Sequence, residues 1–357
     1  MIGVDACGQR SQNDGARLGF TSDNTPLSTP SGGVDRASGN VESGVVQLIA
    51  EPASVQSIAH GQVPADVMRY VQAATAENTR RAYRGDVADF IAFGGCIPST
   101  PEQLAAYMTS RAALHAPATI MRRVIGIGRA HSLQGYADPS KTDLVRTVAR
   151  GLRRTHGRPQ RQAAPFLREE LVRAVSIAHG MRGLRDRALL LLGFAAALRR
   201  SELVGLDVEH LERAREGVVV HLVRSKTDQE GHGRRIAVPY GRTQACPVTA
   251  IDAWLGAAAI ERGPVFRSLD KAGAVGAARL SAQSVSLIVK HRANAMGLDP
   301  AAFSAHSLRA GLVTSAAQAG VTVSKIQAQT GHRSLAVLAR YVRDAKIFEN
   351  NAAGLLL

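Results

Sequence analysis

Two short β-branched runs, "GVVVHLVRSKT" and "GRRIAVPY", set the strongest limit on the fold of this chain. The segment between them, "DQEGHG", carries glycines that suit a tight turn, so the two runs predict a β-hairpin. Helical patterns surround this pair, with "LRDRALLLLGFAAALRRSELVGL" before it and a helical pattern from Pro247 to the C-terminus. The sequence therefore predicts a mainly α fold with a small β-hairpin or sheet.

The charge balance narrows the class of partner. The net charge is +15 and the pI is about 10.6, with arginine carrying most of the positive charge. An excess of this size points to a polyanion, most often nucleic acid, although a generally basic proteome would also give it. No apolar run approaches the ~18 residues of a membrane span, and no basic amphipathic helix with a bulky apolar face is visible, so no membrane partner is expected.

The beginning of the chain and its cysteines indicate a cytoplasmic protein. The N-terminus "MIGVDACGQRSQNDG" lacks the apolar segment of a signal peptide. The three cysteines, Cys7, Cys96 and Cys246, lie far apart and show no metal-binding spacing, so they read as thiols in a reducing compartment.

Composition divides the chain into four segments. Residues 1–53 are rich in Gly, Ser, Asn and Asp and predict a disordered polar tail. Residues 54–154 carry helical periodicity without β-alternation and predict an all-helical domain. Residues 155–165, "THGRPQRQAAP", are polar, basic and proline-bearing, as in an interdomain linker. Residues 166–357 form the second domain, with a C-terminal tail.

Two helix starts can be placed in the first domain. Asn78 is a good N-cap for "NTRRAYRGDVADFIAF", which spaces apolar residues helically. Thr100 is the expected cap of the next helix, with Pro101 at its first position.

A set of polar residues in the second domain stands in a particular order. Arg-x-x-Glu in a helical segment is followed by a lysine on the predicted hairpin, then by His-x-x-Arg, and last by Gly-His with a tyrosine nine residues on. Each motif alone has a plain explanation, such as a surface ion pair, a solvated lysine or a half-buried aromatic residue. The residues are Arg199, Glu202, Lys226, His306, Arg309, His332 and Tyr341.

The ordered set resembles the tyrosine recombinase, or phage integrase, family over residues 70–350. The resemblance implies an all-helical core-binding (SAM-like) domain, an α+β catalytic domain and a C-shaped clamp on DNA. It carries over Arg199, Lys226, His306, Arg309 and His332 as catalytic residues, Tyr341 as the nucleophile and Glu202 as a supporting residue. The chain departs from the family at Ala197, where many members have glycine, and residues 1–50 match nothing in it.

The chemistry of these side chains agrees with the resemblance. A phenol can hold a phosphate covalently, but its pKa of about 10 requires activation. Two guanidiniums can clamp the charge of the phosphoryl transition state, which fits Arg199 and Arg309. Lys226 can protonate the leaving 5′-hydroxyl as a general acid, and His306 can accept the tyrosine proton or hydrogen-bond to the phosphate.

Two further roles complete the expected site. His332 can donate to a phosphate oxygen, and Glu202 can orient a neighbouring cation. No carboxylate cluster suggests a metal, so we expect no metal and no other cofactor, with arginines in the place that Mg²⁺ takes in other phosphoryl-transfer enzymes.

The expected partner is double-stranded DNA bearing recombination sites. The candidates for DNA contact in the first domain are Arg80, Arg81, Arg84, Arg122 and Arg123. The resemblance implies a homo-tetramer on synapsed DNA, with a monomer or weak oligomer in the absence of DNA, and a cytoplasmic, nucleoid-associated location. The C-terminal segment is expected to dock either on a neighbouring protomer or on its own domain.

The predicted function is that of a site-specific DNA recombinase acting through a 3′-phosphotyrosyl intermediate, without metal or ATP. One alternative is a non-enzymatic regulator, because the segment around Gly320 resembles a helix-turn-helix. A second alternative is a type IB topoisomerase-like enzyme, which uses related tyrosine chemistry.

Overall fold

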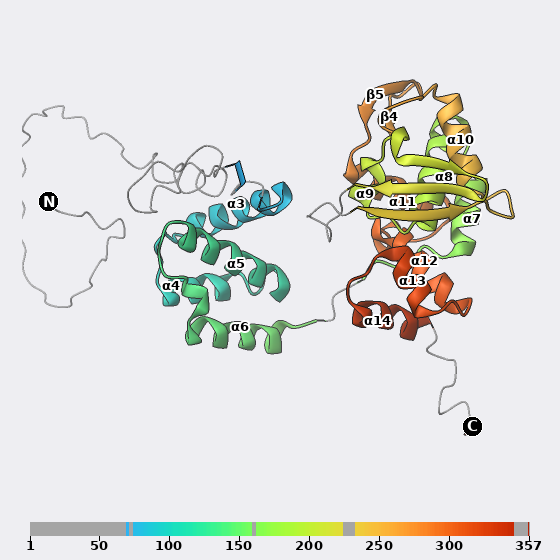
Figure 1. The fold of residues 1–357 in the computed structure, drawn as a ribbon. Helices are drawn as coiled ribbons and strands as arrows, with labels where there is room; N and C mark the ends of the chain where they lie inside the picture. The colour runs from blue at the N-terminus through green and yellow to red at the C-terminus, as the bar shows by residue number, and fades with distance from the viewer. Residues whose placement is uncertain (1–68, 71–73, 159–161, 224–232, 346–355, 357) are drawn as a thin grey trace, which may run out of the picture. The chain divides into compact units, whose positions relative to one another are not determined.

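The computed structural model describes residues 69–70, 74–158, 162–223, 233–345 and 356. The chain separates into two compact units, Met1–Gln160 and Arg161–Leu357 (Figure 1). Among the described residues, no helix has both the length and the apolar character needed to cross a membrane. The predicted tail at 1–53 lies outside the described residues, as does most of the C-terminal segment after Ala345.

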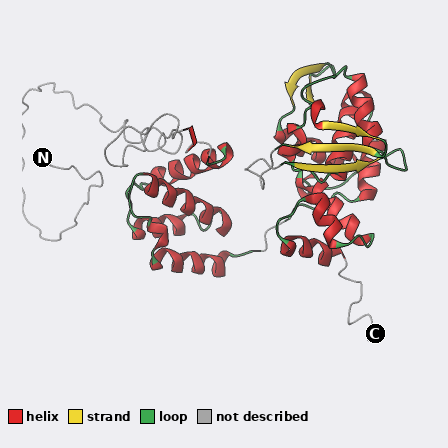
Figure 2. Cartoon of the chain, in the orientation of Figure 1, coloured by secondary structure: helices red, strands yellow, loops and turns green. Residues whose placement is uncertain are grey.

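The described part of the first unit consists of helices joined by loops, with no strand (Figure 2). Apolar side chains at helical spacing face inward and form one buried cluster, which includes Val87, Phe90, Leu104, Ile120 and Ile127. The helices are α3 (Glu77–Ala92), α4 (Pro101–Ser110), α5 (Pro117–Leu133) and α6 (Asp143–His156).

One of the two predicted helix starts is confirmed. Thr100 caps α4, where its hydroxyl accepts a hydrogen bond from the backbone N–H of Gln103 at 3.2 Å and Pro101 follows at the first helical position. The prediction for Asn78 is wrong, because α3 begins at Glu77 and its N-cap residue is Ala76. Glu77 instead places a carboxylate in the first turn, where the helix dipole favours negative charge.

The second unit combines helices with a small antiparallel sheet (Figures 1 and 2). Strands β1 (Leu211–Ala214), β2 (Gly217–Leu222) and β3 (Arg234–Pro239) pair in the order β1-β2-β3. The predicted hairpin is therefore confirmed as β2 and β3, with Val220 opposite Ile236. The helices are α7 (Arg168–Ser176), α8 (Gly180–Ala195), α9 (Arg200–Gly205), α10 (Pro247–Ala257), α11 (Ala282–Ala295), α12 (His306–Gln318), α13 (Val323–Thr330) and α14 (Leu335–Ala345).

The expectation of an entirely helical pattern after Pro247 is wrong. Strands β4 (Arg267–Leu269) and β5 (Val275–Arg279) form a second, two-stranded sheet there. Their residues are half-buried or exposed, so they lack the apolar alternation by which a strand is recognised in sequence.

Two apolar clusters hold the second unit together. The large one joins the three-stranded sheet to α7–α11 and includes Phe166, Trp254 and Phe266. The small one consists of Val313, Ala317, Ile326 and Leu338 from α12, α13 and α14, with Tyr341 and Val342 packed against it.

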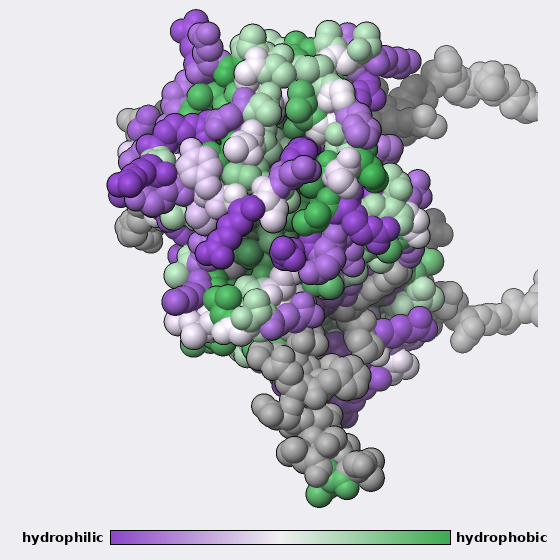
Figure 3. All heavy atoms as spheres, turned by 90° about the vertical axis from the view of Figure 1, so that its right-hand side faces the viewer, coloured by the Kyte–Doolittle hydropathy of each residue, from purple (hydrophilic) through white to green (hydrophobic). Residues whose placement is uncertain are grey.

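On the face drawn in Figure 3, hydrophilic and hydrophobic side chains are interspersed.

Candidate active site

Arg199 and Glu202 form a compact pair at the start of α9. Arg199 is the N-cap residue of this helix rather than a part of it, and its backbone N–H donates to Glu202 Oε2 at 2.8 Å. Its guanidinium Nη1 also donates to Glu202 Oε1 at 2.6 Å. Both carboxylate oxygens of the buried Glu202 are therefore engaged by one arginine, which fixes the direction of that guanidinium.

Arg309 enters the same region from α12. Its side chain is buried, and Nη1 donates to the carbonyl oxygen of Ala197 at 2.6 Å, just before Arg199 in the chain. Ala197 has φ 50°, a left-handed conformation that favours glycine. The left-handed conformation at residue 197 thus explains why glycine suits this position, where this chain has alanine.

Tyr341, on α14, faces His306 at the beginning of α12. The tyrosine Oη lies 3.2 Å from His306 Nε2, and the ring packs against the small apolar cluster. Since α12 and α14 pack against each other in that cluster, the fold brings together two side chains that are far apart in the sequence. A histidine at this distance can accept the phenolic proton.

His332 is held by the turn that ends α13. Gly331 is the C-cap of this helix and has φ 63°, so the turn uses the conformational freedom of glycine. His332 Nδ1 lies 2.7 Å from Thr330 Oγ1, and the buried Thr330 hydroxyl donates to Ile326 O at 2.8 Å. Because that bond uses the only hydroxyl hydrogen, Thr330 accepts from His332 Nδ1–H, which leaves Nε2 directed elsewhere.

The site is strongly electropositive, and this shifts its pKa values. Burial lowers the pKa of His306, and the charges of Arg309 and Arg199 lower it further. Burial, followed by the same two arginines, lowers the pKa of His332 to about 4. Burial also lowers the pKa of Arg309 to about 10, with Arg199 adding to the effect. Both histidines are therefore neutral at pH 7, and the guanidiniums remain charged.

Six of the seven predicted residues of the second domain lie among the described residues. Hydrogen bonds join Arg199 to Glu202 and His306 to Tyr341. The charges of Arg309, Arg199 and His306 lower the pKa of His332, so these side chains lie close enough to interact electrostatically. Lys226 lies outside the described residues, between β2 and β3.

Arg234 is a residue that the sequence analysis did not single out. Its guanidinium reaches the Gly331 turn, where a Cβ on Gly331 would overlap Nη1 and lie 2.9 Å from Cζ. Burial lowers its pKa, which the charge of Glu202 raises and that of Arg199 lowers. A signal was present in the sequence, because residues two apart in a strand share a face and Arg234 is in phase with the buried Ile236 and Val238.

The five arginines proposed for DNA contact in the first unit differ in their surroundings. Arg80 donates to Glu77 at 2.5 Å and Arg84 donates to the same carboxylate at 3.2 Å. Arg81, on the same helix, is exposed. Both Arg80 and Arg84 belong to an exposed network at the start of α3, a position from which a phosphate can compete for them.

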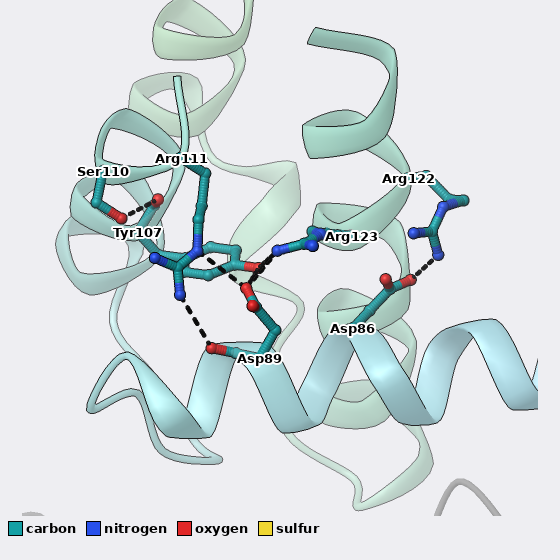
Figure 4. Close-up of polar contacts among 7 residues, drawn as sticks. All are labelled: Asp86, Asp89, Tyr107, Ser110, Arg111, Arg122 and Arg123. Atoms are coloured by element: carbon teal, nitrogen blue, oxygen red, sulfur yellow. Dashed lines mark hydrogen bonds and ion pairs between the residues drawn. The ribbon is translucent and has the colours of Figure 1, made fainter. Parts of the chain in front are cut away.

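Arg122 and Arg123 instead join α5 to α3 (Figure 4). Arg122 pairs with the buried Asp86 and keeps 45% of its side chain exposed, whereas Arg123 pairs with Asp89 and is only 14% exposed. Figure 4 shows Asp89 facing Arg111, Arg123 and the hydroxyl of Tyr107, which donates to it at 2.7 Å. This network gives Arg123 a structural role inside the unit, and contact with DNA stays a prediction for all five arginines.

The chain is similar in sequence to known integrases and recombinases. The model of the phage integrase family matches residues 166–347. An integrase/recombinase xerD homolog of Selenomonas ruminantium is 38% identical over 295 residues, which cover 80% of this chain and 86% of that protein. The recombinase Cre of Escherichia phage P1 is 24% identical over 268 residues, which cover 69% and 77% of the two chains.

Solved structures show the same fold. The XerH site-specific recombinase bound to a palindromic difH substrate superposes with a TM-score of 0.58 at 14% identity, covering 89% of this chain and 96% of that one. A lambda integrase dimer bound to a COC′ core site gives a TM-score of 0.54 at 16% identity, covering 80% and 96%.

Proposed function

We propose residue roles from the premise that the chain belongs to the phage integrase family: it is a tyrosine recombinase, an enzyme that breaks and rejoins DNA at specific sites. Neither the helix-turn-helix regulator nor the type IB topoisomerase-like enzyme is favoured, since the named relatives are integrases and recombinases. The helical turn at Gly320 instead connects α12 to α13.

Tyr341 is the proposed nucleophile. Its oxygen attacks the scissile phosphorus, its proton passes to Nε2 of His306, and the bond between phosphorus and the 5′-oxygen breaks. The product is a 3′-phosphotyrosyl bond, which stores the free energy of the phosphodiester, so rejoining needs no ATP. The observation that carries this assignment is the 3.2 Å distance between Tyr341 Oη and a neutral His306 beside the buried Arg309.

Arg199 and Arg309 are the proposed clamp on the non-bridging oxygens. Each is held by a bond on one side, Arg199 by Glu202 and Arg309 by the Ala197 carbonyl, and is therefore preorganised. Arg309 Nη2 is buried and has no hydrogen-bond partner among the described residues, so it has a donor to offer to a phosphate. The hydrogen of neutral His332 is on Nδ1 and donates to Thr330, so Nε2 donates to a phosphate oxygen only once the phosphate charge has brought a second proton onto the imidazole.

Lys226 is the proposed general acid. A 5′-alkoxide is a poor leaving group, and a lysine between β2 and β3 can supply its proton. Glu202 acts on the phosphate only through Arg199, so it is a positioning residue.

The proposed partner is duplex DNA carrying recombination sites, bound by a homo-tetramer in the cytoplasm at the nucleoid. The net charge of +15 supports binding to a polyanion. Sedimentation of the protein with excess duplex site tests the stoichiometry, and a complex that never exceeds two protomers would contradict the tetramer.

The proposed chemistry can be tested with a nicked suicide duplex that carries the DNA flanking the gene. We expect a covalent protein–DNA adduct on a denaturing gel in the presence of EDTA. Tyr341→Phe should abolish the adduct, while Tyr240→Phe, which removes an exposed hydroxyl in the same unit, should leave it unchanged. An adduct that persists in Tyr341→Phe, or that requires a divalent metal, would overturn the assignment.

A further inference from the structure

Arg234 carries buried hydrogen-bond donors that nothing in the described part of the chain accepts. Its Nη1 and Nη2 are both buried and unbonded. Among the described residues, the other terminal guanidinium nitrogen in this condition is Nη2 of Arg309, whereas the remaining unbonded buried side-chain atoms are Nε atoms and one glutamine amide nitrogen. Arg234 thus resembles Arg309 of the proposed phosphate clamp in having a buried terminal guanidinium nitrogen without a hydrogen-bond partner.

Among the described residues, Arg292 and Arg123 are poorly exposed arginines that carboxylates neutralise, unlike the buried Arg309. Arg292 donates to Asp186 at 2.8 Å, and Arg123 pairs with Asp89. An unpaired charged donor in the interior is strongly destabilising, because nothing replaces the water that it loses on burial. The absence of a carboxylate bonded to Arg234 in the described residues therefore indicates that its charge serves another anion.

The position of Arg234 is at the proposed active site. Its guanidinium contacts the Gly331 turn, directly before His332. Its charge contributes to lowering the pKa of His332 and that of Arg309, after larger effects of burial and of Arg199. Gln329 links this turn to β3 through a bond to Ala237 O at 3.3 Å, so α13 and β3 are held together here.

The charges of the site do not balance within the protein. Glu202 is the carboxylate whose charge couples to Arg234 and Arg309, and both of its oxygens are taken by Arg199. Three guanidiniums and one carboxylate leave two positive charges. A phosphodiester carries one negative charge, and attack by the Tyr341 oxygen adds negative charge to its non-bridging oxygens, so the charge that these guanidiniums face grows toward the transition state.

We propose that Arg234 is a third cation of the scissile-phosphate site, which stabilises the negative charge of the phosphoryl transition state together with Arg199 and Arg309. This inference rests on the proposed function. As the Tyr341 oxygen bonds to phosphorus and the 5′-oxygen leaves with a proton from the general acid, the excess charge on the non-bridging oxygens is greatest. A fixed cation in a poorly solvated position acts most strongly at that moment.

A purely structural role for Arg234 predicts a different dependence on the substrate. If the side chain only supports the Gly331 turn, its loss impairs the enzyme regardless of the charge on the phosphate. If the side chain acts on that charge, its loss matters little on a substrate whose scissile phosphate is neutral. A methylphosphonate replaces one non-bridging oxygen by a methyl group and so removes the ground-state charge.

The experiment compares adduct formation on two nicked duplexes, one with a phosphate and one with a methylphosphonate at the scissile position. Arg234→Met keeps much of the length of the side chain and removes its charge. Arg235→Met is the matched control, because Arg235 is the next residue of β3, lies on the opposite face, and pairs with the exposed Glu212 with 67% of its side chain exposed.

On the phosphate, we expect Arg234→Met to slow adduct formation by about 10²-fold, the usual effect of removing one group that stabilises a transition-state oxyanion. On the methylphosphonate, its rate should lie within about threefold of the parent enzyme, since no monoanion is left to stabilise. Arg235→Met should match the parent on both substrates.

Three results would overturn the inference. They are full activity of Arg234→Met on the phosphate, an equal defect on both substrates, and recovery only when the methylphosphonate occupies the neighbouring phosphate. If circular dichroism shows that Arg234→Met does not fold, Arg234→Lys takes its place in the experiment. We expect Arg234→Lys to show a smaller defect on the phosphate and a rate close to that of the parent enzyme on the methylphosphonate. A parent enzyme that forms no adduct on the phosphate contradicts the proposed function instead.

Discussion

The hydroxyl of Tyr341 lies 3.2 Å from His306 Nε2, although the two residues are 35 positions apart in the chain. This pairing depends on α12 and α14 packing side by side on the small apolar cluster. Because burial, and after it the neighbouring arginines, lowers the pKa of His306, the imidazole is neutral at pH 7 and can accept the phenolic proton.

The first prediction concerns the pH dependence of this pair. The pKa of His306 is lowered from 6.5, so the imidazole stays neutral as the pH falls through 6.5 and loses its acceptor nitrogen only below that. Single-turnover adduct formation should therefore keep its rate at pH 6.5 and decline at lower pH. His306→Asn should react about 10²-fold or more slowly and lack this acid limb. An acid limb centred above pH 6.5 would contradict the assignment.

The second prediction tests Lys226 as the general acid. Lys226→Ala should slow cleavage of an ordinary duplex by about 10²-fold or more. A duplex with sulfur in place of the bridging 5′-oxygen releases a thiolate, which is a far weaker base than an alkoxide, so departure needs no proton donor. The variant should then cleave at nearly the parental rate, whereas Arg309→Ala should stay impaired. A defect in Lys226→Ala that persists with the sulfur substrate would exclude this role.

The third prediction concerns Thr330, which positions His332. Thr330→Val keeps the shape of the side chain and removes the acceptor for His332 Nδ1–H. The loss of a hydrogen bond worth about 1 kcal/mol should slow adduct formation by up to about tenfold. In a His332→Ala background, the same change should have no further effect on the rate. Additive losses in the double variant would show that Thr330 acts on the fold and not through His332.

The fourth prediction separates DNA contact from structural support in the first unit. Arg81→Ala removes an exposed side chain of α3, so we expect weaker DNA binding, a shallower salt dependence and no change in melting temperature. Arg123→Ala should instead lower the melting temperature, because it leaves Asp89 without one of its partners. Titrations over a range of salt concentrations, together with thermal melts, distinguish the two. If both variants changed DNA binding and melting temperature in the same way, the assignment of Arg81 to DNA contact and of Arg123 to structural support would be wrong.

The fifth prediction concerns Asp89 itself. Burial raises the pKa of Asp89, but hydrogen bonds from Tyr107 and Arg111 and the charge of Arg123 outweigh it, and the net pKa is lowered. A lowered carboxyl pKa gives stability that is present above the unfolded value of about 3.9 and is lost as the pH falls through the folded value. Asp89→Asn should cost about 1–3 kcal/mol at pH 7. Urea unfolding at pH 7 and pH 3 should show this difference shrinking at the lower pH.

Much of the candidate site could be predicted because its residues stand in a recognisable order. The hairpin of β2 and β3 followed from β-branched runs and turn glycines, and the Thr100 cap followed from its side-chain chemistry. The contact between Arg199 and Glu202 was also anticipated, although Arg199 precedes α9 instead of lying within it.

Other features depend on tertiary structure that no local pattern contains. The strand period places Arg234 on the face of Ile236 and Val238, but its contact with the Gly331 turn depends on the fold. The strands β4 and β5 are half-buried or exposed, so their sequences carry no strong alternation. Asn78 was favoured as a cap by its residue type alone, while the helix began one residue earlier.

Tyr341, the proposed nucleophile, packs on a cluster of four buried side chains and not on the main core of its unit. The free energy that keeps Tyr341 beside His306 is therefore a local quantity, smaller than the free energy of unfolding the whole unit. Amide hydrogens of α14 should exchange with solvent sooner than those of α8, and we expect the same opening to separate Tyr341 from His306. A substitution at Leu338 can thus silence strand cleavage in a protein that otherwise remains folded.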